Sequence, residues 1–288
     1  MRRIDLFRLI LLATIWGGSF LFMRILAPVL GVLWTVEARV GLAGLALLTY
    51  LAFTGQKMFF STHWRQYLVL GLLNSAIPFV LFTFAALTIP AGYSAIINAT
   101  SPLWGALIGA LVLHETLTAR KIGGLIIGVA GVAFLVRLGP VDVTLEVALA
   151  AGACASAALC YAIAGVFSKK AAQTLSSAQM ATGSQLFAAL VILPLLPLAP
   201  VTGPVTPFIL LIAAALALLC SAVAYFIYFR LMVDIGPTKA LTVTFLVPLF
   251  AVLWGAVFLG EHVTLTMLAG CAMVVAATWL VVFTPRPA

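Results

Sequence analysis

Two opposite charges, Glu37 and Arg39, lie two residues apart in an apolar run long enough to cross a membrane, VLWTVEARVGLAGLALLTYLAF. We expect Arg39 to hold backbone carbonyls or a helix end; the alternative is that it clamps a substrate carboxylate. Glu37 could carry a proton, or it could form an ion pair with Arg24 or Arg39. Side chains two apart on a helix diverge by about 200°, so the pair cannot share one cavity comfortably.

A second group of polar residues follows one face of a predicted helix. Ser94, Asn98, Ser101 and Gly105 are spaced at i, i+4, i+7 and i+11, which puts them on one side of a helix. Asn98 is our strongest candidate for substrate contact, because its amide both donates and accepts hydrogen bonds. The alternative is a hydrogen bond to a neighbouring helix that fixes the packing.

Further candidates for substrate binding lie deep in apolar runs. The aromatic ones could form a wall with polar tips, although ordinary packing or interfacial anchoring is favoured for each one alone. The small polar ones could hydrogen-bond a solute, since polar groups inside a membrane tend to face a cavity. These candidates are Trp16, Asn74, Phe79, Tyr161, Ser221 and Tyr225.

A block of sixteen residues is written twice. SPLWGALIGALVLHET begins at Ser101, and VPLFAVLWGAVFLGEH follows 146 residues later, with seven identical positions. Pro102 and Pro248 match and are predicted to be paired hinges, because proline removes a helix hydrogen bond; a static bend is the alternative. Glu115 and Glu261 end the two blocks, and we expect them to pin a loop or a gate to nearby cations.

The composition predicts an all-α integral membrane protein. The 288 residues are 65% hydrophobic and 8% charged, which excludes a soluble domain of this length. Continuous apolarity over about 20 residues indicates spanning helices and argues against barrel strands. HExxH, GxSxG and P-loop motifs are missing, and the four cysteines form no CxxC pair. We therefore expect no enzyme, no cofactor and no metal site.

Ten transmembrane helices are predicted. The first is basic and then apolar like a signal peptide, but it is long and lacks a clear cleavage site, so we expect it to stay uncleaved. The predicted spans are 8–27, 33–53, 66–87, 92–113, 119–138, 146–167, 178–199, 207–230, 238–259 and 265–283.

The positive charges predict the orientation. With the N-terminus in the cytoplasm, twelve of the fifteen Lys and Arg residues are cytoplasmic: Arg2, Arg3, Arg8, Lys57, Arg65, Arg120, Lys121, Lys169, Lys170, Arg230, Lys239 and Arg286. Because this excess reports topology, we expect no nucleic-acid partner. The lipid bilayer is the expected setting, as a multi-pass protein of the inner cell membrane with both termini cytoplasmic.

The 146-residue offset extends beyond the quoted block. It aligns Arg39 with Gln185 and Phe79 with Tyr225, and an offset of 145 aligns Trp16 with Tyr161. We therefore expect two five-helix repeats, 1–140 and 141–288. Because five is odd, the second repeat would be inverted in the membrane, around a central cavity, as in many transporters that work by alternating access.

The IWGGSF first span ending at Arg24, the EAR of the second span and the repeated P…G…E block resemble the EamA-type drug/metabolite transporters. The resemblance covers nearly the whole chain. It implies a carrier, since many members export amino acids, related metabolites or xenobiotics. It also implies a central cavity lined mainly by predicted spans 1, 3, 4, 6, 8 and 9.

We therefore expect a secondary active transporter that exports a small-molecule substrate, with amino acids and related compounds as the first choice. Without an ATP site, an ion gradient or the substrate's own gradient must drive it, and proton coupling is one option. A multidrug cation exporter is the second interpretation. The first predicted span argues against it, because it carries Arg24 and lacks the buried carboxylate that would attract a cation. A lipid-handling or intramembrane enzyme is the third, and it would need clustered catalytic polar residues near one interface.

Overall fold

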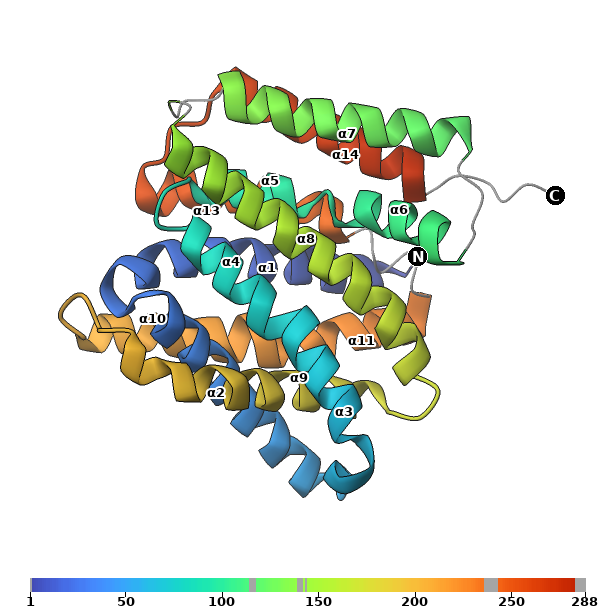
Figure 1. Ribbon diagram of the computed structural model, residues 1–288, viewed down its shortest axis with the longest axis vertical. Helices are drawn as coiled ribbons and strands as arrows, with labels where there is room; N and C mark the ends of the chain where they lie inside the picture. The colour runs from blue at the N-terminus through green and yellow to red at the C-terminus, as the bar shows by residue number, and fades with distance from the viewer. Residues whose placement is uncertain (1, 114–117, 139–141, 143, 236–242, 283–288) are drawn as a thin grey trace.

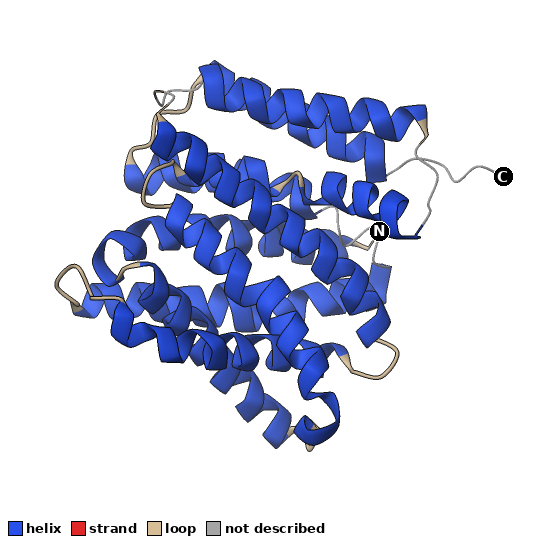
Figure 2. Cartoon of the chain, in the orientation of Figure 1, coloured by secondary structure: helices blue, strands red, loops and turns tan. Residues whose placement is uncertain are grey.

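The computed structural model describes the chain except for residues 1, 114–117, 139–141, 143, 236–242 and 283–288. Every regular element in this described part is a helix, as Figure 2 shows. The elements are α1 (Arg3–Leu30), α2 (Val32–Phe53), α3 (Phe60–Gly71), η1 (Leu72–Ala76), α4 (Ile77–Ala85), α5 (Ala91–Asn98), α6 (Ser101–Leu113), α7 (Ala119–Leu138), α8 (Leu145–Ala171), α9 (Ser177–Ile192), η2 (Leu193–Leu198), α10 (Pro207–Ala217), η3 (Leu218–Val223), α11 (Ala224–Ile235), α13 (Val243–Leu259) and α14 (Leu265–Val282).

Several helical segments are long and apolar enough to cross a bilayer, and each overlaps a predicted span. Six meet that description by length and composition: Arg3–Leu30, Val32–Phe53, Phe60–Ala85, Leu145–Ser168, Ser177–Leu198 and Pro207–Tyr228. Val243–Leu259 and Leu265–Val281 are shorter apolar helices. The start of the predicted span 238–259 lies outside the described residues up to 242.

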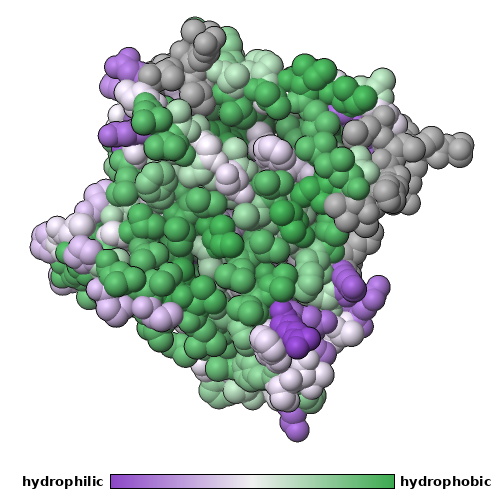
Figure 3. Space-filling view, in the orientation of Figure 1, coloured by the Kyte–Doolittle hydropathy of each residue, from purple (hydrophilic) through white to green (hydrophobic). Residues whose placement is uncertain are grey.

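The outer surface suits lipid contact. Figure 3 shows apolar side chains over the middle of the molecule and hydrophilic ones gathered toward the ends of the helices. Phe53, Leu198 and Leu265 are 80% exposed or more, which would be unfavourable in water but not against acyl chains. Each helix has hydrophobic residues both on the side that faces lipid and on the side that faces the other helices, so its sequence is apolar throughout.

Small residues bring the helices together. α7 and α14 lie side by side at one edge of the molecule (Figure 1). At Gly124 on α7, an added Cβ would lie 2.9 Å from the Ala277 carbonyl oxygen of α14. Close approach through glycine is typical of membrane helix pairs. Elsewhere α2 packs on α9, α4 packs on α8, and α1 packs on both α11 and α13.

Two π-helical segments interrupt longer helices. η1 joins α3 to α4, and η3 joins α10 to α11. They begin at Leu72 and Leu218, again 146 residues apart. A π segment leaves backbone groups displaced from the regular ladder and is frequent at functional sites. These segments could not be predicted from the sequence, because no residue pattern distinguishes a π turn from an α-helical turn in an apolar run.

The predicted span 92–113 is not one helix. α5 ends at Asn98, residues 99–100 form a turn, and α6 begins at Ser101. Thr278 Oγ1 on α14 donates a hydrogen bond to the Ala99 carbonyl at 3.0 Å, which satisfies an acceptor at the break. The continuous polar face predicted from Ser94 to Gly105 is therefore wrong, because the turn divides it.

Candidate functional site

Arg39 lies at the centre of the bundle, where α2 meets α1, α4 and η3. Its Nε donates to Ser221 Oγ at 3.1 Å, and its NH1 lies 3.6 Å from Met23 Sδ. The guanidinium carbon stands 3.6 Å from the centroid of the Phe79 ring, a cation–π contact. Arg39 therefore contacts side chains here, and among the described residues it holds none of the backbone carbonyls that we expected.

A second hydrogen bond is equivalent to the one between Arg39 and Ser221. Gln185 on α9 donates through Nε2 to Ser75 Oγ in η1 at 3.1 Å. Gln185 follows Arg39 by 146 residues, and Ser221 follows Ser75 by 146 residues. Each bond thus joins a polar residue of one chain half to the π-segment serine of the other. Ser75, Gln185 and Ser221 are fully buried or nearly so.

Tyr225 connects the two bonds. Its hydroxyl accepts a hydrogen bond from Asn74 Nδ2 at 3.0 Å, and it lies within electrostatic range of Arg39, as does Tyr161. Seven residues from α2, η1, α4, α9, η3 and α11 therefore form one group, which we call the central cluster: Arg39, Asn74, Ser75, Phe79, Gln185, Ser221 and Tyr225.

Aromatic side chains lie beside the central cluster in two matching pairs. Trp16 donates through Nε1 to the Cys220 carbonyl at 3.2 Å, and its ring is 5.3 Å from that of Tyr228. Tyr161 stacks on Phe82 at 6.0 Å. Tyr161 follows Trp16 by 145 residues and Tyr228 follows Phe82 by 146. The structure thus brings Trp16 and Tyr161 near the cluster from α1 and α8.

Glu37 points away from the central cluster. It lines a groove of about 500 Å³ between α2 and α9, together with apolar residues such as Leu190 and Leu193, which are more than half exposed. Its Oε2 is buried and accepts no hydrogen bond from a described residue. No ion pair joins Glu37 to Arg24 or Arg39 in the described part of the chain, so that alternative is wrong.

Asn98 and Ser94 lie outside the hydrogen bonds of the central cluster. Asn98 is the last residue of α5, and its carbonyl accepts from Ser101 Oγ at 2.6 Å, with Oδ1 at 3.4 Å from the same oxygen. Ser94 is buried beside Cys154 of α8. Asn98 is half-buried, so its amide is still reachable.

The two proposed hinge prolines occupy different surroundings. Pro102 is the second residue of α6 and directly follows the turn at 99–100, where proline is well tolerated because its missing N–H has no helical partner. Pro248 lies inside the continuous helix α13. The matching sequence therefore does not produce matching backbone, and Pro102 cannot kink a helix that has only just begun.

Helix ends account for two other charged residues. Arg24 NH1 donates to the Ala86 carbonyl at the end of α4, the role that we had expected of Arg39. Glu261 Oε1 accepts from the Ala91 amide at the start of α5 at 3.0 Å, so it binds a helix N-terminus rather than a cation. Its repeat partner Glu115 lies outside the described residues.

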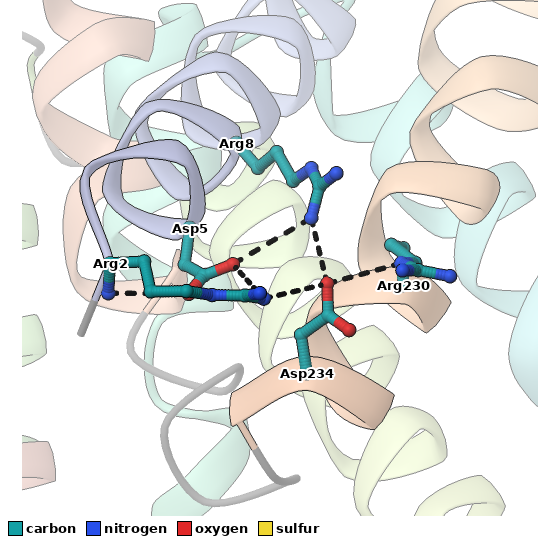
Figure 4. A network of polar contacts seen from close by, with 5 residues as sticks. All are labelled: Arg2, Asp5, Arg8, Arg230 and Asp234. Carbon is teal, nitrogen blue, oxygen red and sulfur yellow. Dashed lines mark hydrogen bonds and ion pairs between the residues drawn. The ribbon is translucent and has the colours of Figure 1, made fainter.

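A cluster of charges ties α1 to α11 at the end of the bundle where α1 begins (Figure 4). Asp234 Oδ2 accepts from Arg8 NH1 at 2.7 Å and lies 3.3 Å from Arg2 NH2, while Arg230 Nε binds the same oxygen from within α11 at 3.1 Å. Asp5 pairs with Arg2 and Arg8 on its own helix. We call these five residues the terminal ion cluster.

Ser75 and Gln185 stood out as polar residues in apolar runs but were not among the proposed site residues, and the terminal ion cluster was not predicted. The repeat offset carried the signal for the first two, because it pairs Gln185 with Arg39 and Ser75 with Ser221. No local pattern could link Arg8 to Asp234, which lies 226 residues away.

Known proteins match most of this chain. The EamA-like transporter family model matches twice, at residues 4–137 and 148–283. Protein PecM of Dickeya dadantii (strain 3937) is 28% identical over 223 residues, which are 76% of this chain and 73% of PecM. The uncharacterized transporter YvbV of Bacillus subtilis (strain 168) is 28% identical over 236 residues, 76% of this chain and 72% of YvbV.

A solved crystal structure shares the fold, with a TM-score of 0.68 and 18% identity over 97% of this chain and 96% of its own. The apolar exterior, the helices of bilayer-spanning length and the polar centre agree with what the sequence matches indicate. A small-molecule substrate and a membrane setting follow from the kind of protein that these matches describe. The chain therefore belongs to the EamA-like transporter family and is a multi-pass membrane transporter.

Proposed function

We propose that this protein is a secondary active transporter that exports small metabolites, with amino acids or related compounds as substrates, by alternating access. The proposal rests on two equivalent hydrogen bonds at the centre of the bundle, from Arg39 to Ser221 and from Gln185 to Ser75. Each bond crosses between the chain halves 1–140 and 141–288. A substrate bound beside them would contact both halves at once, as alternating access requires.

Several equivalences support two inverted five-helix repeats, making ten transmembrane helices. The π segments begin 146 residues apart, and the aromatic pairs follow the same offset. Gly124 faces Ala277 and Val281 across the α7–α14 contact, and Gly270 faces Gly131 and Leu135, so each contact maps onto the other. The family model also matches each half separately.

We place both termini in the cytoplasm of a cell whose inner membrane holds the protein. The positive charges favour this orientation, and α1 begins at the same end of the bundle at which α14 ends (Figure 1). The terminal ion cluster then lies on the cytoplasmic side and holds α1 against α11. The structure would therefore correspond to a state that is closed toward the cytoplasm.

We assign substrate contact to the central cluster, with Trp16 and Tyr161 as aromatic walls. Asn98 and Ser94 would line the cavity nearer the α5–α6 turn. Glu37, whose buried Oε2 accepts no hydrogen bond from a described residue, is the candidate for proton coupling. Pro248 is the candidate hinge, whereas Pro102 would act through the turn that precedes it.

The proposal is tested with purified protein in liposomes preloaded with a pool of radiolabelled amino acids. Efflux is followed with and without an imposed pH gradient, and protein-free liposomes give the background leak. We expect efflux faster than the leak, and a response to the gradient would identify protons as the driving ion. Efflux no faster than the leak for every amino acid would contradict the assignment of amino acids as substrates.

A further inference from the structure

Arg39 is a buried cation, and none of the described acidic residues pairs with it. Its exposed fraction is 6%, and the ion pairs in the described part of the chain lie in the terminal ion cluster. Glu37, the nearest acid in sequence, faces the groove between α2 and α9. An uncompensated charge in an apolar interior is strongly disfavoured, and such residues mark substrate or ion pathways.

The contacts of Arg39 leave part of the guanidinium unused. A guanidinium has five N–H donors in a planar fork, and here Nε binds the Ser221 hydroxyl while NH1 meets the Met23 sulfur. Phe79 covers one face of the plane. The NH2 nitrogen donates to none of the residues that the structure describes. All the partners are neutral, so none supplies a counter-charge.

The equivalent residue in the other half shows that the charge is not needed for the packing. Gln185 makes the matching bond to Ser75 at 3.1 Å, the same length as the bond from Arg39 to Ser221. A neutral amide is therefore sufficient to join α9 to η1. An arginine at position 39 adds a positive charge and a bidentate donor, and a purely structural role uses neither.

We infer that Arg39 binds the carboxylate of the transported solute, which supplies the missing counter-charge when the site is loaded. This inference rests on the proposed transport function and narrows its substrate class to small solutes with a carboxylate group. The planar fork of arginine matches the two oxygens of a carboxylate.

The surroundings of Arg39 fit a zwitterionic amino acid. Gln185 Oε1 is buried and accepts no hydrogen bond from a described residue, so it offers an acceptor to a donor such as an ammonium group. The side chain of Asn74 and the hydroxyl of Tyr225 add neutral polar atoms to the same cluster. A cavity of about 250 Å³ between α2, α9 and α11 includes Tyr225 in its lining, so it borders the cluster.

The test compares solutes that differ only in the carboxylate. Liposomes with wild-type protein are loaded with radiolabelled neutral amino acids or with the primary amines obtained from them by decarboxylation. The variant Arg39→Gln copies the residue of the other half, and its folding is checked by monodisperse elution and helical circular dichroism. Tyr67→Phe is the matched control, because it removes a buried hydrogen bond, from the Tyr67 hydroxyl to the Met58 carbonyl, that involves no residue of the central cluster or of the α5–α6 turn.

Wild-type protein should move the amino acids at least about tenfold faster than the amines, and Arg39→Gln should lower amino-acid flux by a similar factor, the effect of losing a charge-assisted hydrogen bond. Tyr67→Phe should keep both the transport rate and the preference for amino acids over amines. The inference would be overturned if wild-type protein moved amino acids and amines at equal rates. It would also be overturned if a folded Arg39→Gln variant kept the wild-type amino-acid flux. Neither result would contradict transport itself. If Arg39→Gln does not fold, the wild-type comparison alone decides. Wild-type protein that moves neither solute would overturn the proposed function as well.

Discussion

Replacing Asp234 with asparagine should favour opening toward the cytoplasm. Asp234 is the residue of the terminal ion cluster that ties α11 to α1, through Arg8 at 2.7 Å and Arg2 at 3.3 Å. Its bond to Arg230 lies within α11 and does not resist separation of the two helices. Asparagine keeps the shape of the side chain but removes the charge, so the bonds between the helices weaken without a change in packing.

The free energy that Asp234 contributes to the closed state can be estimated from the solvent exposure of its partners. The Arg8 side chain is 29% exposed and Asp234 10%, so this charge-assisted bond contributes about 1.5 kcal/mol. Arg2 is 64% exposed, so solvent screens its pair with Asp234 and it adds little. The closed state should therefore lose about 1.5 kcal/mol, which is roughly a tenfold shift of the equilibrium toward the open state.

Cys220 offers a native reporter of that opening. It is buried in η3 beside Trp16, and its thiol contacts the Ile15 carbonyl of α1. With the other three cysteines replaced by alanine, the rate at which a membrane-impermeant maleimide labels Cys220 from the cytoplasmic side measures the open population. We expect labelling to be roughly tenfold faster in Asp234→Asn, in line with the shift in population.

Asp5→Asn is the matched control for this experiment. Asp5 belongs to the same cluster, but its partners among the described residues are Arg2, directly before α1, and Arg8, within α1. Its loss should change the labelling rate by no more than a few-fold, because neither of its ion pairs joins α1 to α11. An unchanged rate in Asp234→Asn, or an equal increase in Asp5→Asn, would refute the idea that Asp234 holds the cytoplasmic side closed.

Three further outcomes are expected. Gly124→Ala should cost about 1–3 kcal/mol of stability and so lower the thermal midpoint in detergent, because the added Cβ would lie 2.9 Å from the Ala277 carbonyl oxygen. Gly123→Ala should leave the midpoint unchanged, because an added Cβ there meets open space. Glu37→Gln should abolish the response of transport to a pH gradient in liposomes; a response of normal size would remove Glu37 from proton coupling. Asn98→Ala should slow flux while leaving membrane insertion intact, and transport at the wild-type rate would exclude Asn98 from the site.

The helices were predictable because their cause is local. A membrane helix must satisfy its backbone internally and face acyl chains, so it needs a long apolar run, and such runs marked segments such as Val32–Phe53 and Leu145–Ala171. The turn at 99–100 was not predictable in this way. Its freed carbonyl is satisfied by Thr278 from α14, which lies far along the chain, and the turn residues themselves are ordinary for a helix.

The polar centre was only partly predictable for a related reason. Arg39, Asn74, Ser221 and Tyr225 stood out as polar side chains in apolar runs, where each must find a partner. Which partner each one found depended on the packing of helices from both halves. Glu37 illustrates the limit, because it stood out equally and yet faces the α2–α9 groove.

The unpaired guanidinium of Arg39 also has an electrical consequence. A unit charge that crosses the full membrane potential changes in energy by about 2.3 kcal/mol for each 100 mV. Any displacement of α2 along the membrane normal moves this charge through part of that field. A neutral amino acid bound to Arg39 adds no net charge, because its ammonium group offsets its carboxylate, so the empty and the loaded site both carry one positive charge. The interior-negative potential of a cell would therefore favour the state with Arg39 nearer the cytoplasm in both halves of the cycle.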